Sequence, residues 1–169
     1  ILRVIMIKKL LLLFAFLFLI FTTLSACGEV REDRTKNIEI GKDYKEFKKT
    51  KPLAEQGNSN AQLKLALMYD KGQGVLPDRK EAVKWFLLAA EQNEPEAQYS
   101  LGLKYYDGKG VTKDFPQAYK WFNIASANGH KRGKSMSEIL KKEMTAPQLA
   151  SAKKLIREAK KSGADAVKF

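Results

Sequence analysis

The hydrophobic residues of the chain form two unlike patterns, a continuous run near the N-terminus and a periodic pattern further along. The run occupies residues 10–21, directly after Lys8 and Lys9, and the residues behind it are mostly small. A basic start, a short hydrophobic core and a small-residue end are the layout of a secretory signal peptide. The run is shorter than the roughly 20 residues that a membrane-spanning helix needs. We therefore predict that residues 1–26 include a signal peptide translated from Met6.

The periodic pattern recurs at an offset of 36 residues. The residues of the first copy that recur at this offset are Ala61, Leu65, Tyr69, Gly72, Gly74, Val75, Asp78, Ala82, Trp85, Phe86 and Ala89. Their counterparts run from Ala97 to Ala125 and include Trp121, so both tryptophans of the chain take part. This many matches at one offset indicate an internal repeat.

Each copy predicts a first helix that ends in a glycine-containing turn. Ala61, Leu65 and Tyr69 are four residues apart and therefore share one face of a helix. Gly72 and Gly74 follow, and two closely spaced glycines are typical of a tight turn. The same spacing occurs in phosphate-binding loops, but no strand precedes it and no Gly-Lys-Ser/Thr ending follows. We expect a structural turn between two helices.

The second helix of each copy is predicted by its start signal and its hydrophobic face. Glu81 follows Asp78 by three residues, which is the spacing of a capping box. In the second copy Pro116 follows Asp114, and proline suits the first turn of a helix, where its missing N–H has no partner in any case. We expect both aspartates to be helix caps rather than catalytic carboxylates. The residues on one face of the first copy's second helix are Ala82, Trp85, Phe86 and Ala89.

The combined pattern of glycines, aromatic residues and alanines resembles the Sel-one-like repeat (SLR), a relative of the tetratricopeptide repeat. The resemblance implies an all-α fold, namely a short right-handed α-solenoid of helix-turn-helix repeats. It extends over residues 43–163, with full repeats at 61–96 and 97–132 and a partial repeat on either side.

The partial repeats depart from the pattern at particular positions. Upstream, residues 51–58 resemble the end of a second helix and its turn, although Lys49 stands where the repeat has tryptophan. Downstream, residues 133–142 resemble a lone first helix, with Ser137 in place of leucine and Lys141 in place of tyrosine. These departures weaken the packing expected of both segments.

An amphipathic segment near the C-terminus predicts a last helix. Thr145 and Gln148 have the spacing of a capping box. The hydrophobic residues that follow are Leu149, Ala152, Leu155, Ile156 and Ala159. The other side carries a basic patch made of Lys153, Lys154, Arg157, Lys160 and Lys161. An end repeat has no neighbour to bury it, so a helix with one polar face suits the cap of a solenoid. Residues 164–169 are expected to be a short tail.

The single cysteine of the chain, Cys27, directly follows Leu24-Ser25-Ala26. This sequence resembles the lipobox of bacterial lipoproteins, in which the leader is cleaved before the cysteine and a diacylglyceryl group is attached to its thiol. The alternatives are an uncleaved anchor, or cleavage after Ala26 with an incidental cysteine. Gly28 follows in place of aspartate, and by the same resemblance this favours the outer membrane. Residues 27–42 are polar and mixed in charge, which predicts a flexible tether.

The net charge of +12 is concentrated towards the C-terminus. Residues 27–129 contain 17 basic and 15 acidic residues, whereas residues 130–169 contain 11 and 4. The basic patch suits anionic lipid head groups, lipopolysaccharide phosphates or an acidic partner. The alternative is an ordinary solvated helix face. We expect no nucleic-acid partner, because an exported lipoprotein rarely meets nucleic acid.

Each first helix carries a second hydrophobic stripe beside the one already described. Its members are Leu63 and Leu67 in the first repeat and Tyr99, Leu103 and Tyr106 in the second. First helices line the concave side in the tetratricopeptide class, so the resemblance places these residues in a groove. Such a groove would hold a peptide or helix of an envelope or host protein. The alternative is that the stripe packs against the adjacent repeat.

The remaining residues give no sign of catalytic, metal or cofactor chemistry. One cysteine and one histidine cannot form an internal disulfide, a cysteine zinc cluster or a histidine-rich metal site. His130 lies at a predicted turn and is expected on the surface. We predict a non-enzymatic, membrane-anchored adaptor with no small-molecule substrate. The alternatives are a cell-wall-active protein or wall-fragment binder, which needs a pocket with converging carboxylates, and a lipid or polysaccharide binder that uses the basic patch.

Overall fold

The computed structural model of the protein describes residues 41–161, and within that range it contains helices and turns but no strand. The chain divides into two compact units, Ile1–Lys42 and Asp43–Phe169, and the helices below belong to the second. Residues 43–55 are helical and are followed by α2 (Ser59–Lys71), α3 (Arg79–Glu91), α4 (Pro95–Asp107), α5 (Phe115–Ala127), α6 (Gly133–Glu143) and α7 (Ala146–Lys161). The predicted signal peptide, Cys27, most of the tether and the tail lie outside the described residues.

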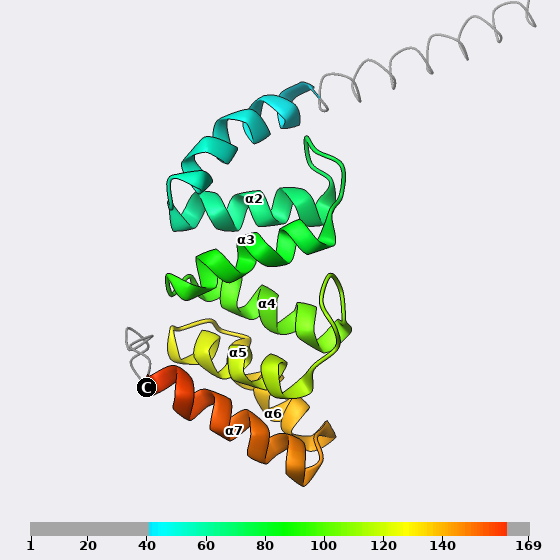
Figure 1. Cartoon of the computed structure of the whole chain (residues 1–169), viewed down its shortest axis with the longest axis vertical. Helices are drawn as coiled ribbons and strands as arrows, with labels where there is room; N and C mark the ends of the chain where they lie inside the picture. The colour runs from blue at the N-terminus through cyan, green and yellow to red at the C-terminus, as the bar shows by residue number, and fades with distance from the viewer. Residues whose placement is uncertain (1–40, 162–169) are drawn as a thin grey trace, which may run out of the picture. The chain divides into compact units, whose positions relative to one another are not determined.

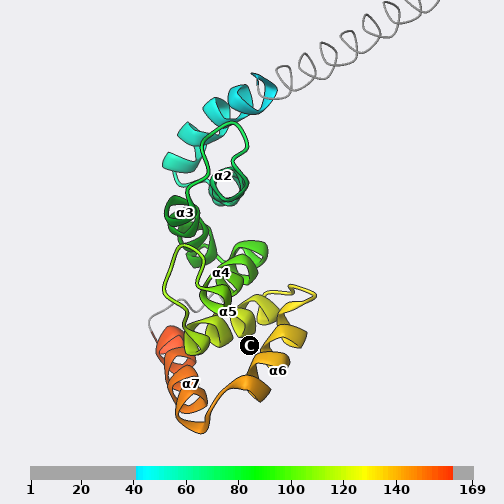
Figure 2. The same ribbon diagram turned by 90° about the vertical axis from the view of Figure 1, so that its right-hand side faces the viewer.

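Successive helices pack against one another along the stack (Figure 1). α2 packs on α3, α3 on α4 and α4 on α5, so each full repeat contributes one helix pair. At the end of the stack α5 contacts both α6 and α7, which lie on different sides of it (Figure 2). The all-α helical-repeat fold predicted from the repeated pattern is confirmed.

The core consists of residues that recur at the repeat offset. Leu65 and Leu101 of the two first helices are fully buried, and so are Phe86 and Phe122 of the two second helices. Small residues between them let neighbouring helices approach closely, while the tryptophans fill the wider gaps. The other buried hydrophobic residues that recur in both repeats are Ala61, Ala82, Trp85, Ala89, Ala97, Ala118, Trp121 and Ala125.

The second glycine of each turn lies against the preceding repeat. Gly110 has φ +83°, and a Cβ atom there would be 2.2 Å from the carbonyl oxygen of Arg79, at the start of α3. Gly74 has φ +71° and makes the equivalent approach to the carbonyl oxygen of Asp43. Because Asp43 and Arg79 occupy the same repeat position, residues 43–55 form the second helix of a preceding partial unit. This agrees with the interpretation of residues 51–58.

The helix caps agree with the sequence in part. Asp78 accepts a hydrogen bond from the backbone N–H of Glu81 at 3.0 Å, as predicted. A capping box also predicts that the backbone N–H of Asp78 donates to the Glu81 side chain, and this prediction was wrong. The N–H of Asp78 donates instead to the carbonyl oxygen of Tyr69 at 2.9 Å. Thr145 and Gln148 form both halves of a capping box, with the Thr145 N–H donating to Gln148 Oε1 at 2.9 Å.

The two last helices close the array. α6 packs tightly on α5, since a Cβ atom on Gly133 would lie 2.6 Å from the backbone nitrogen of Ser126. Ser137, which replaces the leucine of the repeat, is buried. α7 buries Ala152 completely and leaves its cationic side in solvent. The exposed cations are the whole predicted basic patch, Lys153, Lys154, Arg157, Lys160 and Lys161.

We expect Gly110→Ala to destabilise the protein more than Gly129→Ala. Both positions have a positive φ, which costs a residue with a Cβ atom about 1–2 kcal/mol. At Gly129 nothing lies within 4 Å of an added Cβ, whereas at Gly110 the Arg79 backbone must move. Overpacking of this kind costs about 1–3 kcal/mol more. Urea denaturation measures the free energy of unfolding, and equal losses in the two variants would contradict the close approach.

Candidate partner-binding surface

A buried glutamine links each repeat to the one before it. The side-chain amide of Gln98 donates to the carbonyl oxygen of Ala90 at 3.0 Å and accepts from Asn128 Nδ2 at 2.9 Å. Gln62 makes the same pair of bonds, to the Ala54 carbonyl oxygen at 3.2 Å and from Gln92 Nε2 at 2.7 Å. Gln98 is fully buried, so both bonds are needed to offset the loss of water.

The glutamines are structural residues that the hydrophobic pattern did not reveal. Gln62 and Gln98 match at the repeat offset, and this match was the available signal. Their partners Gln92 and Asn128 also share a repeat position, but a glutamine and an asparagine do not count as a sequence match. Comparing hydrogen-bonding capacity rather than residue identity would have found the pair.

An ion pair joins the first helices of the two repeats. Lys104 Nζ lies 2.5 Å from Asp70 Oδ1, and the two side chains are only 11% and 24% exposed. A charge in so dry a position needs a partner, because leaving it alone carries a large desolvation cost. This pair therefore couples α2 to α4 in addition to their shared contacts with α3.

The predicted groove residues form two separate groups. Leu63 and Leu67 of α2 are half-buried and pack against the first core cluster, which includes Leu65 and Phe86. The other three members belong to α4 and contribute to the second core cluster. Those three are Tyr99, Leu103 and Tyr106. None of these five residues lines the hollow of about 470 Å³ that the structure contains. Binding of a partner by these residues stays a prediction.

Tyr99 follows the packing alternative rather than the groove alternative. Its side chain is 5% exposed, and its ring stacks on that of His130 with centroids 4.1 Å apart. The ring of Phe122 lies 5.5 Å away on another side. Tyr106 is more accessible, and its hydroxyl donates to Glu143 Oε2 at 3.1 Å. This hydrogen bond and the carboxylate charge raise the pKa of the Tyr106 hydroxyl.

The expectation that His130 lies on the surface was wrong. Its side chain is only 10% exposed, and Nε2 lies 3.0 Å from a carboxylate oxygen of Glu96. Its Nδ1 atom is buried and has no hydrogen-bond partner among the described residues. The ring is covered because Tyr99, from a different helix, stacks on it. Such a contact cannot be inferred from the turn sequence around His130.

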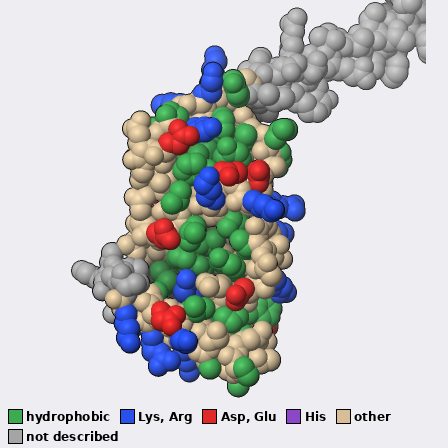
Figure 3. All heavy atoms as spheres, viewed as in Figure 1, with side chains coloured by type: hydrophobic (Ala, Val, Ile, Leu, Met, Phe, Trp, Pro, Cys, Tyr) green, Lys and Arg blue, Asp and Glu red, His purple; other side chains and the backbone are tan. Residues whose placement is uncertain are grey.

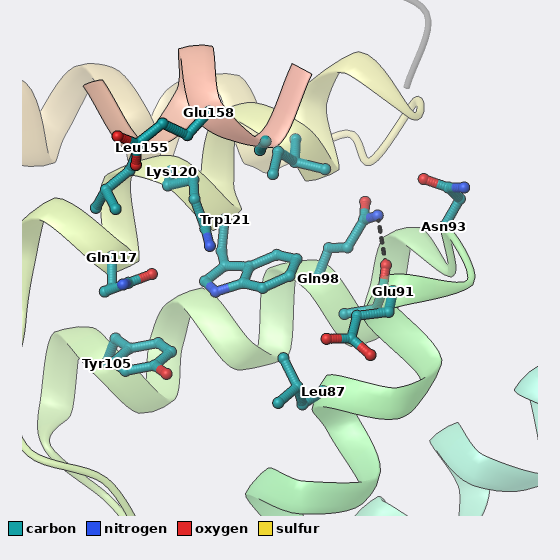
Figure 4. A pocket seen from close by; sticks show the side chains of 13 residues that line it. Leu87, Glu91, Asn93, Gln98, Tyr105, Gln117, Lys120, Trp121, Leu155 and Glu158 are labelled. Carbon is teal, nitrogen blue, oxygen red and sulfur yellow. Dashed lines mark hydrogen bonds between the residues drawn. The ribbon is translucent and has the colours of Figure 1, made fainter. Parts of the chain in front are cut away.

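A hollow of about 470 Å³ lies on the face of the stack where the second helices α3 and α5 meet α7. Figure 3 shows hydrophobic side chains gathered on this face over the middle of the stack, with charged groups among and around them. Figure 4 shows α7 along one side of the hollow and α3 across from it. The residues that line it include Leu87 and Glu91 of α3, Lys120, Trp121 and Ile124 of α5, and Leu155 and Glu158 of α7.

The ionisable groups of the hollow differ in their exposure. Burial lowers the pKa of Lys120, and the charges of Glu91 and Asp114 oppose that shift. Burial, with a contribution from the Asp114 charge, raises the pKa of Tyr105, so its hydroxyl stays protonated and able to donate. Glu91 and Glu158 are exposed at the rim and belong to different helices. A catalytic acid is held in a drier environment than this.

The composition and helix lengths of residues 41–161 bear on a possible metal site or membrane span. No cluster of three or more histidine, cysteine or acidic residues there could hold a metal ion. Among the same residues, none of the helices combines the length and the hydrophobicity that crossing a bilayer requires.

The helix pairs, the glycine turns and the buried inter-repeat contacts define an all-α protein of tandem helical repeats. The model of the Sel1 repeat matches the chain twice, at residues 59–94 and 95–130. The chain belongs to the Sel1 repeat family. Among curated proteins no relative matches it.

The solved structures similar to this chain include a Sel1 repeat protein and an Escherichia coli antigen. A Sel1 repeat protein from Oxalobacter formigenes is 37% identical, with a TM-score of 0.52, and the match covers 53% of this chain and 67% of that one. The other is c5321, a protective antigen present in uropathogenic Escherichia coli strains and displaying an SLR fold. It is 34% identical with a TM-score of 0.69, and the match covers 73% of this chain. This chain spans only 27% of the length of c5321.

We expect Asp70→Asn to lower the free energy of unfolding by about 1–3 kcal/mol, because an amide leaves the Lys104 charge uncompensated. The matched control is Asp107→Asn, which removes the Asp107–Lys109 pair, whose side chains are 36% and 53% exposed. Exposed pairs contribute little, so the control should stay within about 0.5 kcal/mol of the parent. Chemical denaturation measures the free energy of unfolding of both variants. A large loss in both would contradict the claim that the buried ion pair is more stabilising than the exposed one.

Proposed function

We propose that this protein is a lipid-anchored adaptor that binds another protein in the hollow formed by α3, α5 and α7. The coarse part of this function rests on the family, since Sel1 repeats commonly serve as protein-interaction scaffolds. The finer part concerns which face binds, what anchors the chain and where it works. No bond chemistry on the partner is part of the proposal.

The observation that carries the binding face is the composition of the hollow. Its hydrophobic lining combines Leu87, Trp121, Ile124 and Leu155, and the lining also includes the charged residues Glu91, Lys120 and Glu158. A hydrophobic centre inside a polar rim is the usual anatomy of a protein interface. Its volume is also sufficient for one or two side chains of a partner.

The anchor is supported by the sequence around Cys27. The lipobox-like Leu24-Ser25-Ala26-Cys27 follows a basic and hydrophobic leader at the correct distance. Acyl chains on this cysteine would hold the protein at a membrane surface, and residues 28–42 would then act as a spacer. The proposed location is the bacterial envelope, in the outer membrane, and the proposed partner is an envelope or host protein.

Photo-crosslinking from the two faces tests the binding surface. A benzoylphenylalanine residue placed at Glu91 reports on the hollow, and one placed at Lys64 reports on the first-helix face beside Leu63 and Leu67. We expect a discrete crosslinked partner from position 91 in intact cells, because that residue lines the rim of the hollow. Mass spectrometry of the crosslinked band identifies the partner. Crosslinks from position 64 alone would move the interface to the first helices and contradict the proposal.

Fractionation of cells tests the anchor. We expect the parent chain to stay in the membrane pellet after a wash with about 1 M salt, which is concentrated enough to screen charge contacts. Cys27→Ser should move the protein into the soluble fraction. The control Lys153→Gln/Lys154→Gln keeps the cysteine and should remain in the pellet. Retention of Cys27→Ser after the salt wash would show that something other than lipidation holds the chain.

A further inference from the structure

The hollow contains one feature that a general adaptor surface does not require, a lysine in an unusual environment. Lys120 lies over the ring of Trp121, with Nζ 4.3 Å from the ring centroid. Figure 4 shows the amine of Lys120 next to the indole, with Leu155 of α7 close to the same side chain. Burial lowers its pKa, which reflects the cost of holding a charge there.

The first repeat holds the equivalent lysine in an exposed ion pair. Lys84 occupies the equivalent position, and its Nζ lies 3.4 Å from Glu81 with the side chain 59% exposed. Three residues before Lys120 the second repeat has Gln117, which carries no charge. Among residues 41–161 no carboxylate forms an ion pair with Lys120. The second repeat therefore keeps the cation and buries it further, and the two carboxylates whose charges act on it, Glu91 and Asp114, form no ion pair with it.

We propose that the hollow binds a single carboxylate side chain of a partner protein, held by Lys120 and flanked by a hydrophobic side chain on Trp121 and Leu87. This assignment rests on the proposed adaptor function and adds the chemistry of the bound segment. The carboxylate would replace the missing counterpart of Glu81, and charge-assisted hydrogen bonds are strongest in such partly dry positions. The indole stabilises the lysine in its charged form by a cation–π contact.

The rim limits which acidic segments fit. Glu91 and Glu158 stand at the edge of the hollow, and both are exposed. Glu91 would repel a second carboxylate beside the one at Lys120, whereas Glu158 is paired with Lys154 at 3.8 Å. The preferred segment therefore has one acidic residue among hydrophobic or basic neighbours, and a run of acidic residues would bind poorly.

Immobilised peptide libraries test this chemistry with the whole chain purified in detergent. The first library contains acetylated hexapeptides with glutamate fixed at the third position, the second has glutamine there, and the third has glutamate at positions two, three and four. We expect the first library to retain about tenfold more protein than the second. The third should retain less than the first. Equal retention on glutamate and glutamine libraries would overturn the proposal.

Two matched lysine variants localise the effect. Lys120→Met should abolish the preference for glutamate, whereas Lys84→Met, at the same position of the other repeat, should leave it unchanged. Circular dichroism melts show whether each variant is folded. A second measurement needs no variant, because bound peptide should protect Lys120 from acetylation more than it protects Lys84, as read by mass spectrometry. A preference that survives Lys120→Met, or equal protection of both lysines, would overturn the assignment.

The chain's own last residues are tested as a competing occupant. A form ending at Lys161 removes residues 162–169, which include Asp165. If only this shortened form prefers the glutamate library, the hollow is filled by the chain itself and the assignment to a partner is overturned. The outcome is also separable from that of the adaptor proposal. Crosslinks from position 91 without a preference for glutamate would contradict only the proposed carboxylate site. An absence of crosslinks from that position would contradict the proposal that the hollow is the binding face.

Discussion

The array depends on the contact that each helix pair makes with the pair before it. A single pair cannot bury both of its hydrophobic sides, so neighbouring pairs must stack. Hydrophobic burial favours stacking but has little directionality. The direction comes from the buried amide of Gln98, whose bonds to Ala90 and Asn128 fix where α4 sits against the end of α3 and against the end of α5. The approach of Gly110 to the Arg79 carbonyl group fixes the opposite end of the same repeat.

Much of this fold is predictable from the sequence, because its information is local. The four-residue spacing of Ala61, Leu65 and Tyr69, the paired glycines and the aspartate caps all act within one helix or turn, and the helices form where these signals indicate. The depth of His130 is different in kind. The burial of His130 results from stacking by the ring of Tyr99, which belongs to α4 and is far from His130 in sequence. Neither the turn sequence around His130 nor its polarity therefore predicts this burial. The half-formed cap at Asp78 has a similar origin in the Tyr69 carbonyl group.

The candidate site was less accessible to sequence reasoning. The second stripe of the first helices is visible in the pattern, but its residues already contribute to the core clusters. The hollow arises where α7 packs on α5, and that packing brings Leu155 to the side of Trp121 and Leu87. No periodicity links these three residues, because α7 is not a copy of α3 or α5. The change from Glu81 to Gln117 is readable by comparing repeats, although its meaning depends on how deeply Lys120 lies.

The way α5 carries both α6 and α7 separates the chain into a modular middle and a fixed end. The buried glutamine, its amide partner and the second glycine all lie within a single 36-residue segment, whereas the Asp70–Lys104 ion pair joins two segments. A tandem duplication of residues 97–132 would thus repeat the glutamine and glycine contacts without altering the last two helices, although the new lysine would meet Tyr106 at the position of Asp70. Such a gene could lengthen by whole units, which makes the number of repeats an evolutionary variable rather than a constraint of the fold.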